Sequence, residues 1–289
     1  MTAVPLPDDL PPLKEVIASF GLAARRSLGQ HFLLDPRITA RIAAAAGDLN
    51  GRTVIEIGPG PGGLTRALLA AGAMPLIAIE RDDRCVAALQ NLRTAVAGRL
   101  AIIPADALTV DETGLAATYG GAVPLIVVAN LPYNIATVLI LKWLARTADF
   151  ADIVVMVQKE VAERLAAPPR SSSYGRLSVM VQWRAEVGML FDLAPGAFTP
   201  PPKVVSTVVR ITPRAAPCAP AEFAAMEAVV RAAFGQRRKM LRVALKTLGR
   251  GAAALLDAAG LDPTARAEEL SIEDFAALAR AYTAGHGTT

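Results

Sequence analysis

The sequence predicts an α/β fold, in which a mostly parallel sheet carries helices on both faces and is followed by a small all-helical domain. Short β-rich runs alternate with longer helical runs between about residues 50 and 160, which is the pattern of right-handed βαβ units. A glycine-rich segment, VIEIGPGPGGLT, joins the first of these strands to the first helix. After the proline-rich segment TPRAAPCAPA, all the remaining apolar runs have helical spacing.

The elements divide the chain into three parts. Residues 1–20 are expected to form a loose arm, because four prolines and two aspartates fall within the first twelve positions. Residues 21–213 are expected to form the α/β domain, and residues 214–289 the helical domain. Seven strands are predicted: TVIEI (53–57), PLIAI (75–79), LAIIP (100–104), AVPLIVVAN (122–130), DIVVMVQ (152–158), LSVMVQWRAEVGMLFDL (177–193) and VVSTVVRI (204–211).

Helices are predicted from apolar residues that recur with a period near 3.6. In the α/β domain they cover 62–72, 82–96, 135–146 and 159–167. In the helical domain they cover 222–234, 237–249, 251–260 and 271–282. Ser271, with Asp274 three residues later, is a suitable N-cap for the last of them.

Several classes of protein are disfavoured. The uncharged run from Thr113 to Leu141 is interrupted by glycine and proline well short of about 20 continuous apolar residues, so no membrane helix is expected. The only cysteines, Cys85 and Cys218, are far apart, and the only histidines are His31 and His286. We therefore expect neither a metal site nor a disulfide framework. The first residues lack the basic-then-apolar pattern of a signal peptide, and a cytoplasmic protein is expected.

Positive charge is concentrated near the C-terminus. The net charge of the chain is only +4, but residues 228–256 contain seven Lys or Arg residues and no Asp or Glu. Such a local excess indicates a polyanionic partner. The corresponding candidates for phosphate binding are Arg237, Arg238, Lys239 and Arg242.

The glycine loop predicts a ligand site at the carboxyl end of the first strand. Gly58 and Gly60 allow a tight turn and a close approach of the ligand to the backbone. A dinucleotide site is one alternative, because Glu80 ends the next strand where a carboxylate binds a ribose. Glu56, however, would repel a pyrophosphate and attract a sulfonium or α-ammonium group. S-adenosyl-L-methionine carries both cations and a ribose.

Asp106 follows the third strand and is placed to accept a hydrogen bond from an adenine amino group. Glu56, Glu80 and Asp106 then stand at the carboxyl ends of three successive strands, the edge at which ligands bind in open α/β sheets. The alternative is that they are ordinary polar residues at strand ends. Three such residues beside a glycine loop favour the cofactor site.

The fourth predicted strand ends in Asn130-Leu131-Pro132-Tyr133. Asn130 can offer its side-chain carbonyl, and Leu131, which is biased to an extended conformation by Pro132, can turn its main-chain carbonyl toward the same point. Two converging acceptors suit an exocyclic amino group that attacks a methyl donor. Tyr133 supplies a flat face on which a base can stack. A simple turn with a buried tyrosine is the alternative.

The motifs together resemble the ribosomal RNA adenine N6-dimethyltransferases, most closely the small-subunit branch of the KsgA/RsmA type. The resemblance covers residues 27–282. Its motifs are SLGQHFLLD, VIEIGPGPGGLT, AIERD, ADAL, NLPYNIAT, QKEVAERLAA, YGRLSV, FTPPPKVVSTVV, FGQRRKMLR and ARAEELSIEDFAALA. It implies a seven-stranded, Rossmann-like class I methyltransferase sheet followed by a small helical domain.

The resemblance also implies roles for individual residues. His31 and Leu33 match positions that contact the cofactor, with Gln30 beside them; members of the family also have Asn at the position of His31, which favours a backbone contact there. Phe198 matches a second aromatic wall opposite Tyr133. The remaining matches are Gly58 as a glycine-loop contact, Glu80 for the ribose, Asp106 for the adenine, and Asn130 for both cofactor and substrate.

The substrate implied by the resemblance is a pair of adjacent adenosines in the 3′-terminal hairpin loop of small-subunit rRNA, each of which receives two methyl groups. The partner would be this rRNA, within a pre-30S particle, and the protein would act as a monomer without a membrane. Two alternatives stay open. One is a large-subunit rRNA adenine methyltransferase, and the other is a non-catalytic rRNA-binding or transcription factor on the same fold.

Overall fold

The computed structural model describes residues 5–7, 9–25, 29–249 and 251–285. The chain forms two compact units. The first comprises Met1–Ala162 and Gly188–Pro213, and the second comprises Glu163–Val187 and Arg214–Thr289. The second unit therefore includes residues 163–187, which the sequence analysis places in the α/β domain.

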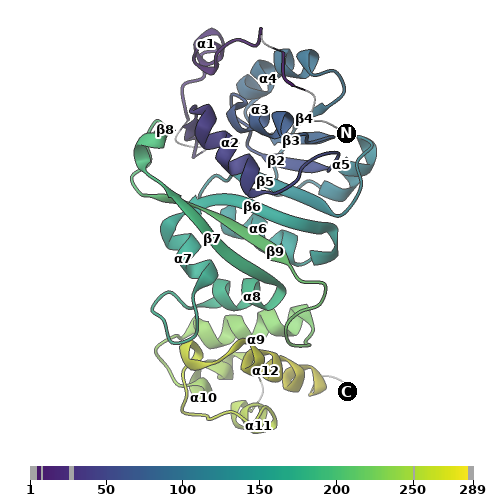
Figure 1. The fold of residues 1–289 in the computed structure, drawn as a ribbon. Helices are drawn as coiled ribbons and strands as arrows, with labels where there is room; N and C mark the ends of the chain where they lie inside the picture. The colour runs from purple at the N-terminus through teal and green to yellow at the C-terminus, as the bar shows by residue number, and fades with distance from the viewer. Residues whose placement is uncertain (1–4, 8, 26–28, 250, 286–289) are drawn as a thin grey trace. The chain divides into compact units, whose positions relative to one another are not determined.

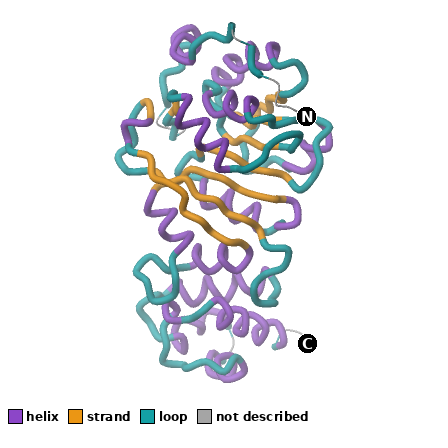
Figure 2. Tube along the Cα trace, viewed as in Figure 1, coloured by secondary structure: helices purple, strands orange, loops and turns teal. Residues whose placement is uncertain are grey.

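The first unit is built on a seven-stranded sheet with the order β4-β3-β2-β5-β6-β9-β7 (Figures 1 and 2). Neighbouring strands from β4 to β6 are parallel, and β9 is antiparallel to β6. The strands are β2 Val54–Ile57, β3 Leu76–Glu80, β4 Leu100–Pro104, β5 Leu125–Asn130, β6 Phe150–Gln158, β7 Ala185–Leu193 and β9 Ser206–Pro213. The predicted α/β fold with seven strands is confirmed.

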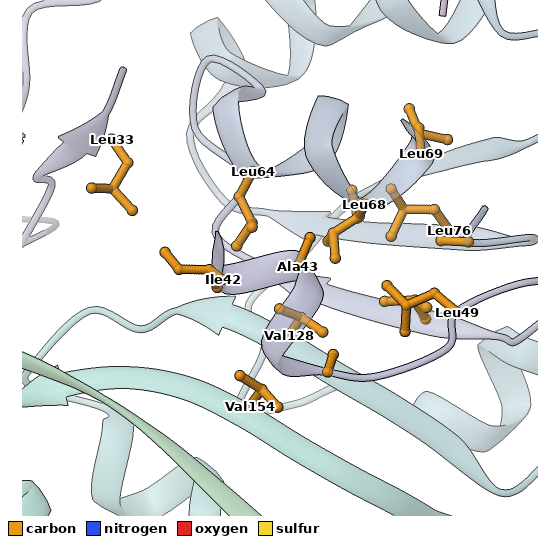
Figure 3. Packing of buried hydrophobic residues seen from close by; sticks show 14 of the residues in the cluster. Leu33, Ile42, Ala43, Leu49, Leu64, Leu68, Leu69, Leu76, Val128 and Val154 are labelled. Atoms are coloured by element: carbon orange, nitrogen blue, oxygen red, sulfur yellow. The ribbon is translucent and has the colours of Figure 1, made fainter. Parts of the chain in front are cut away.

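Helices pack on this sheet through continuous apolar faces. One face is covered by α2 Pro36–Ala45, α3 Gly63–Ala70 and α4 Asp83–Ala95. Figure 3 shows buried residues of this cluster, among them Ala43 of α2, Leu68 of α3 and Val128 of the central strand. Residues 125–129 of β5 are all buried, as expected for a parallel strand covered on both faces. The remaining helices that begin in this unit are α1 Leu13–Ser19, α5 Glu112–Thr118, α6 Ala136–Leu144 and α7 Lys159–Ala166.

The prediction of a loose N-terminal arm is wrong for its second half. Helix α1 buries Val16 against Leu22, Phe32 and Cys85. With seven residues, LKEVIAS is too short to form a stable isolated helix, so the helix depends on this tertiary contact.

The single strand predicted over residues 177–193 is also wrong. The first half is helix α8, Arg176–Arg184, and only the second half is strand β7. In α8 the residues Val179, Met180 and Val181 are all buried, so the apolar run has no period that separates helix from strand. Ser178 Oγ accepts a hydrogen bond from the Gly175 N–H and closes the first turn.

The second unit is helical. It contains α8, α9 Phe223–Gly235, α10 Leu241–Ala244, α11 Ala252–Ala258 and α12 Ile272–Ala284. The predicted N-cap of α12 is confirmed, because Ser271 Oγ accepts from the Asp274 N–H at 3.1 Å. The helix predicted over residues 237–249 is shorter: residues 237–240 form a turn, and a 3-10 segment, Leu245–Leu248, follows α10.

Candidate active site

The candidate site is a cavity at the carboxyl end of β2, in the first unit. β2 lies between β3 and β5. The chain leaves β2 toward β3 and β4 on one side and then returns to β5 on the other side. Such a switch point is where open α/β sheets bind ligands. The cavity is lined by three groups of residues: 29–33 before α2, the glycine loop with the ends of β3 and β4, and 130–135 after β5.

The glycine loop is shaped by close contacts with the N-terminal segment. Gly60 has a φ of +56°, and a Cβ there would lie 3.0 Å from the Phe32 ring. A Cβ on Gly63 would collide with the Leu33 carbonyl oxygen. Only glycine allows this packing of the loop, the start of α3 and the short strand β1, Phe32–Leu33.

Glu80 is held by backbone donors. Its Oε2 accepts from the Gly60 N–H at 3.0 Å, and its Oε1 accepts from the N–H groups of Arg81 and Asp82 at 2.8 Å each. Burial raises the pKa of this carboxyl, and the three backbone hydrogen bonds oppose the shift. A carboxylate has about four acceptor sites, so capacity for a ligand hydroxyl is left after these three bonds.

Glu56 is almost fully buried, and its Oε2 has no hydrogen-bond partner among the described residues. Burial raises its pKa from 4.5 to about 8. The Thr65 hydroxyl, which is near but outside hydrogen-bonding geometry, lowers the pKa of Glu56, while the charge of Glu80 raises it. Because Glu56 also lines the cavity, its free oxygen is a polar atom that a cationic or hydrogen-donating ligand can satisfy.

Asp106 lies just after β4 and lines the same cavity. Its Oδ1 accepts from the Leu108 N–H at 3.0 Å, and its Oδ2 forms an ion pair with Arg81 at 3.1 Å. Arg81 is 69% exposed in its side chain, so this pair is weak and open to exchange for a ligand.

Asn130 is oriented by a backbone carbonyl. Its Nδ2 donates to the His31 carbonyl at 2.8 Å, which fixes the amide plane. No described residue donates to Asn130 Oδ1 or to the Leu131 carbonyl, so both acceptors are available at the cavity. The His31 contact was not predicted from the sequence, since the two residues are 99 positions apart.

Tyr133 and His31 form a stacked pair, with ring centroids 5.7 Å apart and an interplanar angle of 27°. Tyr133 Oη is hydrogen-bonded to Ser206 Oγ at 2.8 Å, and burial raises the pKa of the phenol. His31 Nδ1 donates to the Pro200 carbonyl at 2.8 Å. Both rings are thus fixed by contacts outside the cavity.

Gln30 and Leu33 belong to the wall of the cavity. The Gln30 side chain donates to Asp82 Oδ2 at 3.0 Å and accepts from the Arg25 N–H at 2.9 Å. Asp82 is also paired with Arg84, at 2.6 Å. Neither Asp82 nor Arg84 was predicted from the sequence, although Asp82 directly before a helix is a recognisable N-cap.

The structure does not bring Phe198 to the cavity. Phe198 is 3% exposed, lies in β8 Phe198–Thr199 opposite Leu33 of β1, and belongs to the hydrophobic core. Phe198 therefore does not line the cavity, and its predicted position opposite Tyr133 stays a prediction. Strand pairing with β1 turns its ring inward, and that pairing is a long-range contact which the local sequence does not specify.

The predicted basic cluster is in the second unit. Arg238, Lys239 and Arg242 are exposed, and no described acidic side chain is paired with them. Arg237 differs, because its Nε forms an ion pair with Glu268 at 2.9 Å and its Nη2 donates to the Ser172 carbonyl. Within the described ranges, no group of His, Cys, Asp or Glu could hold a metal ion, and no helix is long and apolar enough to cross a membrane.

Comparison with known proteins identifies relatives along almost the whole chain. Residues 21–284 match the family described as ribosomal RNA adenine dimethylase. A ribosomal RNA small subunit methyltransferase A from Paramagnetospirillum magneticum is 62% identical over 276 residues, or 96% of each chain. The protein of the same description from Rhodospirillum rubrum is 60% identical over 277 residues, covering 96% of this chain and 94% of the relative.

Two solved structures are also similar. A dimethyladenosine transferase from Plasmodium falciparum has a TM-score of 0.72 and 25% identity, over 86% of this chain and 96% of that one. The 23S rRNA methyltransferase ErmE has a TM-score of 0.62 and 27% identity, over 87% of this chain and 99% of that one.

Proposed function

The chain belongs to the ribosomal RNA adenine dimethylase family, and we infer from this membership and from the site that it is an rRNA adenine N6-dimethyltransferase. The sheet and its cavity are those of a class I methyltransferase. The observation that supports catalysis best concerns the Asn130 amide: its nitrogen donates to the His31 carbonyl, and its oxygen accepts from no described residue.

We propose that the cavity binds S-adenosyl-L-methionine, and the donor set fits this cofactor. Glu80 would accept from the ribose hydroxyls, and Asp106 would accept from the adenine amino group after exchange of its bond to Arg81. The orphaned Glu56 Oε2 would face the cationic methionine part. Because Gly58 and Gly60 have no side chains, the ligand would have room next to the backbone of the loop. When bound, this cofactor supplies an electrophilic methyl group.

The residues after β5 would prepare the target base. Asn130 Oδ1 and the Leu131 carbonyl would each accept one hydrogen of the adenine N6 amino group. Holding both hydrogens favours a pyramidal nitrogen whose lone pair points toward the methyl donor. Tyr133 has one ring face covered by His31, and the base would stack on the other face, after being unstacked from its RNA neighbours.

No side chain is needed to remove a proton before the attack, because an amino group already carries a lone pair. Tyr133 is unsuited to that role, since burial raises the pKa of its phenol. His31 holds Asn130 through its main-chain carbonyl, a contact that does not use the imidazole ring. The chain would therefore act by position and electrostatics.

The higher identity of the small-subunit relatives favours small-subunit rRNA as the substrate over large-subunit rRNA. We propose that the targets are two adjacent adenosines in its 3′-terminal hairpin loop, modified within a pre-30S particle. We further propose that the protein works as a monomer in the cytoplasm.

Purified ribosomal subunits that lack these methyl groups provide the test. Small and large subunits would be incubated separately with the protein and S-adenosyl-L-methionine, and the modified positions would be mapped. We expect dimethyladenosine at the small-subunit hairpin alone. Methylation confined to the large subunit would overturn the substrate assignment, and RNA binding without any methyl transfer would support the non-catalytic alternative.

A further inference from the structure

The segment that follows β4 is held in place by one lysine. Lys142, in the last turn of α6, donates from Nζ to the Val110 carbonyl at 2.7 Å and to the Ala107 carbonyl at 3.1 Å. It also forms an ion pair with Glu112 at 2.9 Å. The ammonium group has three hydrogens, and all three have an acceptor in residues 107–112.

The acceptor side of this contact is buried. The Glu112 side chain is 2% exposed, and its Oε1 also accepts from Trp143 Nε1 at 2.8 Å. Lys142 itself is 27% exposed in its side chain. A charged hydrogen-bond donor shielded in this way interacts more strongly with its partners than a pair at the surface.

The segment held by Lys142 is a wall of the cavity. Asp106, Ala107 and Leu108 line the cavity. The turn is closed internally by Asp106, whose Oδ1 accepts from the Leu108 N–H and whose carbonyl accepts from the Thr109 N–H, each at 3.0 Å. Lys142 binds two further carbonyls of the same segment, those of Ala107 and Val110.

The helix that carries Lys142 begins at the other wall. Ile135, the N-cap residue of α6, lines the cavity, and Tyr133 lies two residues before it. The N–H groups of Ile135 and Ala136 both donate to the Pro132 carbonyl, so the Asn130–Tyr133 segment is continuous with the first turn of the helix. Lys142 thus connects the Asp106 turn to the element that positions the Asn130–Tyr133 segment.

We propose that Lys142 is a positioning residue for the cofactor: it sets the distance between the turn at Asp106, which would bind the adenine, and the segment that would hold the target base. The proposal rests on the proposed cofactor site. Lys142 itself does not line the cavity, so its effect on binding passes through the Ala107 and Val110 carbonyls.

Arg146 is a matched control. It lies directly after α6 and bonds to the same part of the chain, with its guanidinium at 3.1 Å from Asp111 and 2.8 Å from Thr113. Its side chain is 48% exposed, and its partners do not line the cavity. Arg146→Met therefore removes a contact between the same two elements without releasing the Asp106 turn.

The experiment compares the wild type, Lys142→Met and Arg146→Met by calorimetry and kinetics. The ligands are S-adenosyl-L-methionine and 5′-methylthioadenosine, which keeps the adenosine and lacks the amino-acid part. We expect Lys142→Met to weaken both ligands by about tenfold, as for the loss of a charged hydrogen bond. The KM for the cofactor should rise with little change in kcat, and Arg146→Met should change either affinity by less than about twofold.

Two outcomes would overturn the inference: wild-type affinities in Lys142→Met, or the same loss in both variants, which would indicate a general packing defect. Because Lys142→Met leaves Glu112 unpaired and could fail to fold, Glu112→Gln is a second variant that keeps an acceptor for Trp143. It should weaken both ligands by a smaller factor, and unchanged binding in that folded variant would also count against the proposal. Failure of the wild type to bind either ligand would refute the cofactor site itself.

Discussion

Asn130 shows how a single side chain is oriented by the fold before any ligand binds. Its amide nitrogen is used by the His31 carbonyl, so the oxygen cannot rotate away from the cavity without breaking that bond. The Leu131 carbonyl beside it accepts no backbone hydrogen bond from the part of the chain that the structure describes. Acceptors that are already oriented need no reorganisation during the reaction, which is the main advantage of an enzyme site over water.

Replacement of Asn130 by alanine should therefore remove one of the two acceptors and leave the strand intact. By analogy with loss of one donor from an oxyanion hole, we expect single-turnover methylation to fall by roughly 100- to 1000-fold. Cofactor and RNA affinities must be measured in the same variant, because Asn130 could contact both. Near-normal transfer by a folded Asn130→Ala protein would refute the mechanism.

Glu56 makes the stability of the unbound protein depend on pH. Its pKa is about 8 in the folded chain and would be near the ordinary value of 4.5 after unfolding. The folded state therefore binds the proton more tightly, and its stabilisation by that proton is complete below about pH 4.5. It decreases as the pH rises and is lost above about pH 8.

Glu56→Gln should abolish this dependence, because the amide has no proton to lose. Denaturant titrations of the unbound wild type should show stability falling between pH 5 and 8, at up to about 1.4 kcal/mol per unit. The variant should show a flatter profile and be the more stable of the two at the upper end. Parallel profiles for the two proteins would mean that Glu56 is ionised or solvated in the folded state.

At the scale of elements, the short strand β1 shapes both the glycine loop and the position of Asn130. Its two residues, Phe32 and Leu33, pack against Gly60 and the start of α3, and the residue before them, His31, orients Asn130. This strand is only two residues long and pairs with β8, more than 160 positions away. Its position depends on a glycine where the two backbones meet.

Gly63→Ala tests that dependence, because the added methyl group would collide with the Leu33 carbonyl oxygen. We expect a loss of stability of about 1 to 3 kcal/mol from overpacking, together with weaker cofactor binding. Gly235→Ala, at the end of α9, is the control: its new methyl group would meet no atom within 4 Å. Equal behaviour of the two variants in thermal unfolding and calorimetry would show that β1 can shift freely.

At the scale of the whole molecule, the positive charge is not shared evenly between the two units. The net charge is only +4, yet Arg238, Lys239 and Arg242 are exposed together in the second unit. Arg237, between Glu268 and the Ser172 carbonyl, has a structural role that its neighbours lack. The RNA contact predicted for Arg237 stays a prediction, and its ion pair with Glu268 sets it apart from the three exposed residues.

Neutralising Arg238, Lys239 and Arg242 together should weaken RNA binding and reduce its salt dependence, by about 0.7 in log–log slope for each lost phosphate contact with single-stranded RNA. Cofactor affinity should be unchanged. Arg237→Ala should instead lower the melting temperature, since it leaves Glu268 without its partner. An unchanged salt slope in the triple variant would assign these three residues to a solvated surface.

The sequence by itself determined the parts of this protein that are coded locally. Short apolar, β-rich runs predicted the seven strands of the sheet, one of them too long at its start. The glycine loop and the strand-end residues Glu56, Glu80, Asp106 and Asn130 line the cavity, as expected. These predictions succeeded because, in a parallel sheet, the carboxyl end of each strand lies at the same edge. Position along the chain then implies position in space.

Only the tertiary structure decided the features that depend on contacts between distant residues. Residues 177–184 fold as a helix, although the apolar run there suits a strand equally well. Phe198 is drawn into the core by its pairing with Leu33, and Asn130 is aimed by the His31 carbonyl. Lys142 binds carbonyls 32 and 35 positions earlier in the chain, and no local sequence pattern predicts these contacts. Each depends on a partner brought close by the fold, and the free energy of such a contact is a property of both partners.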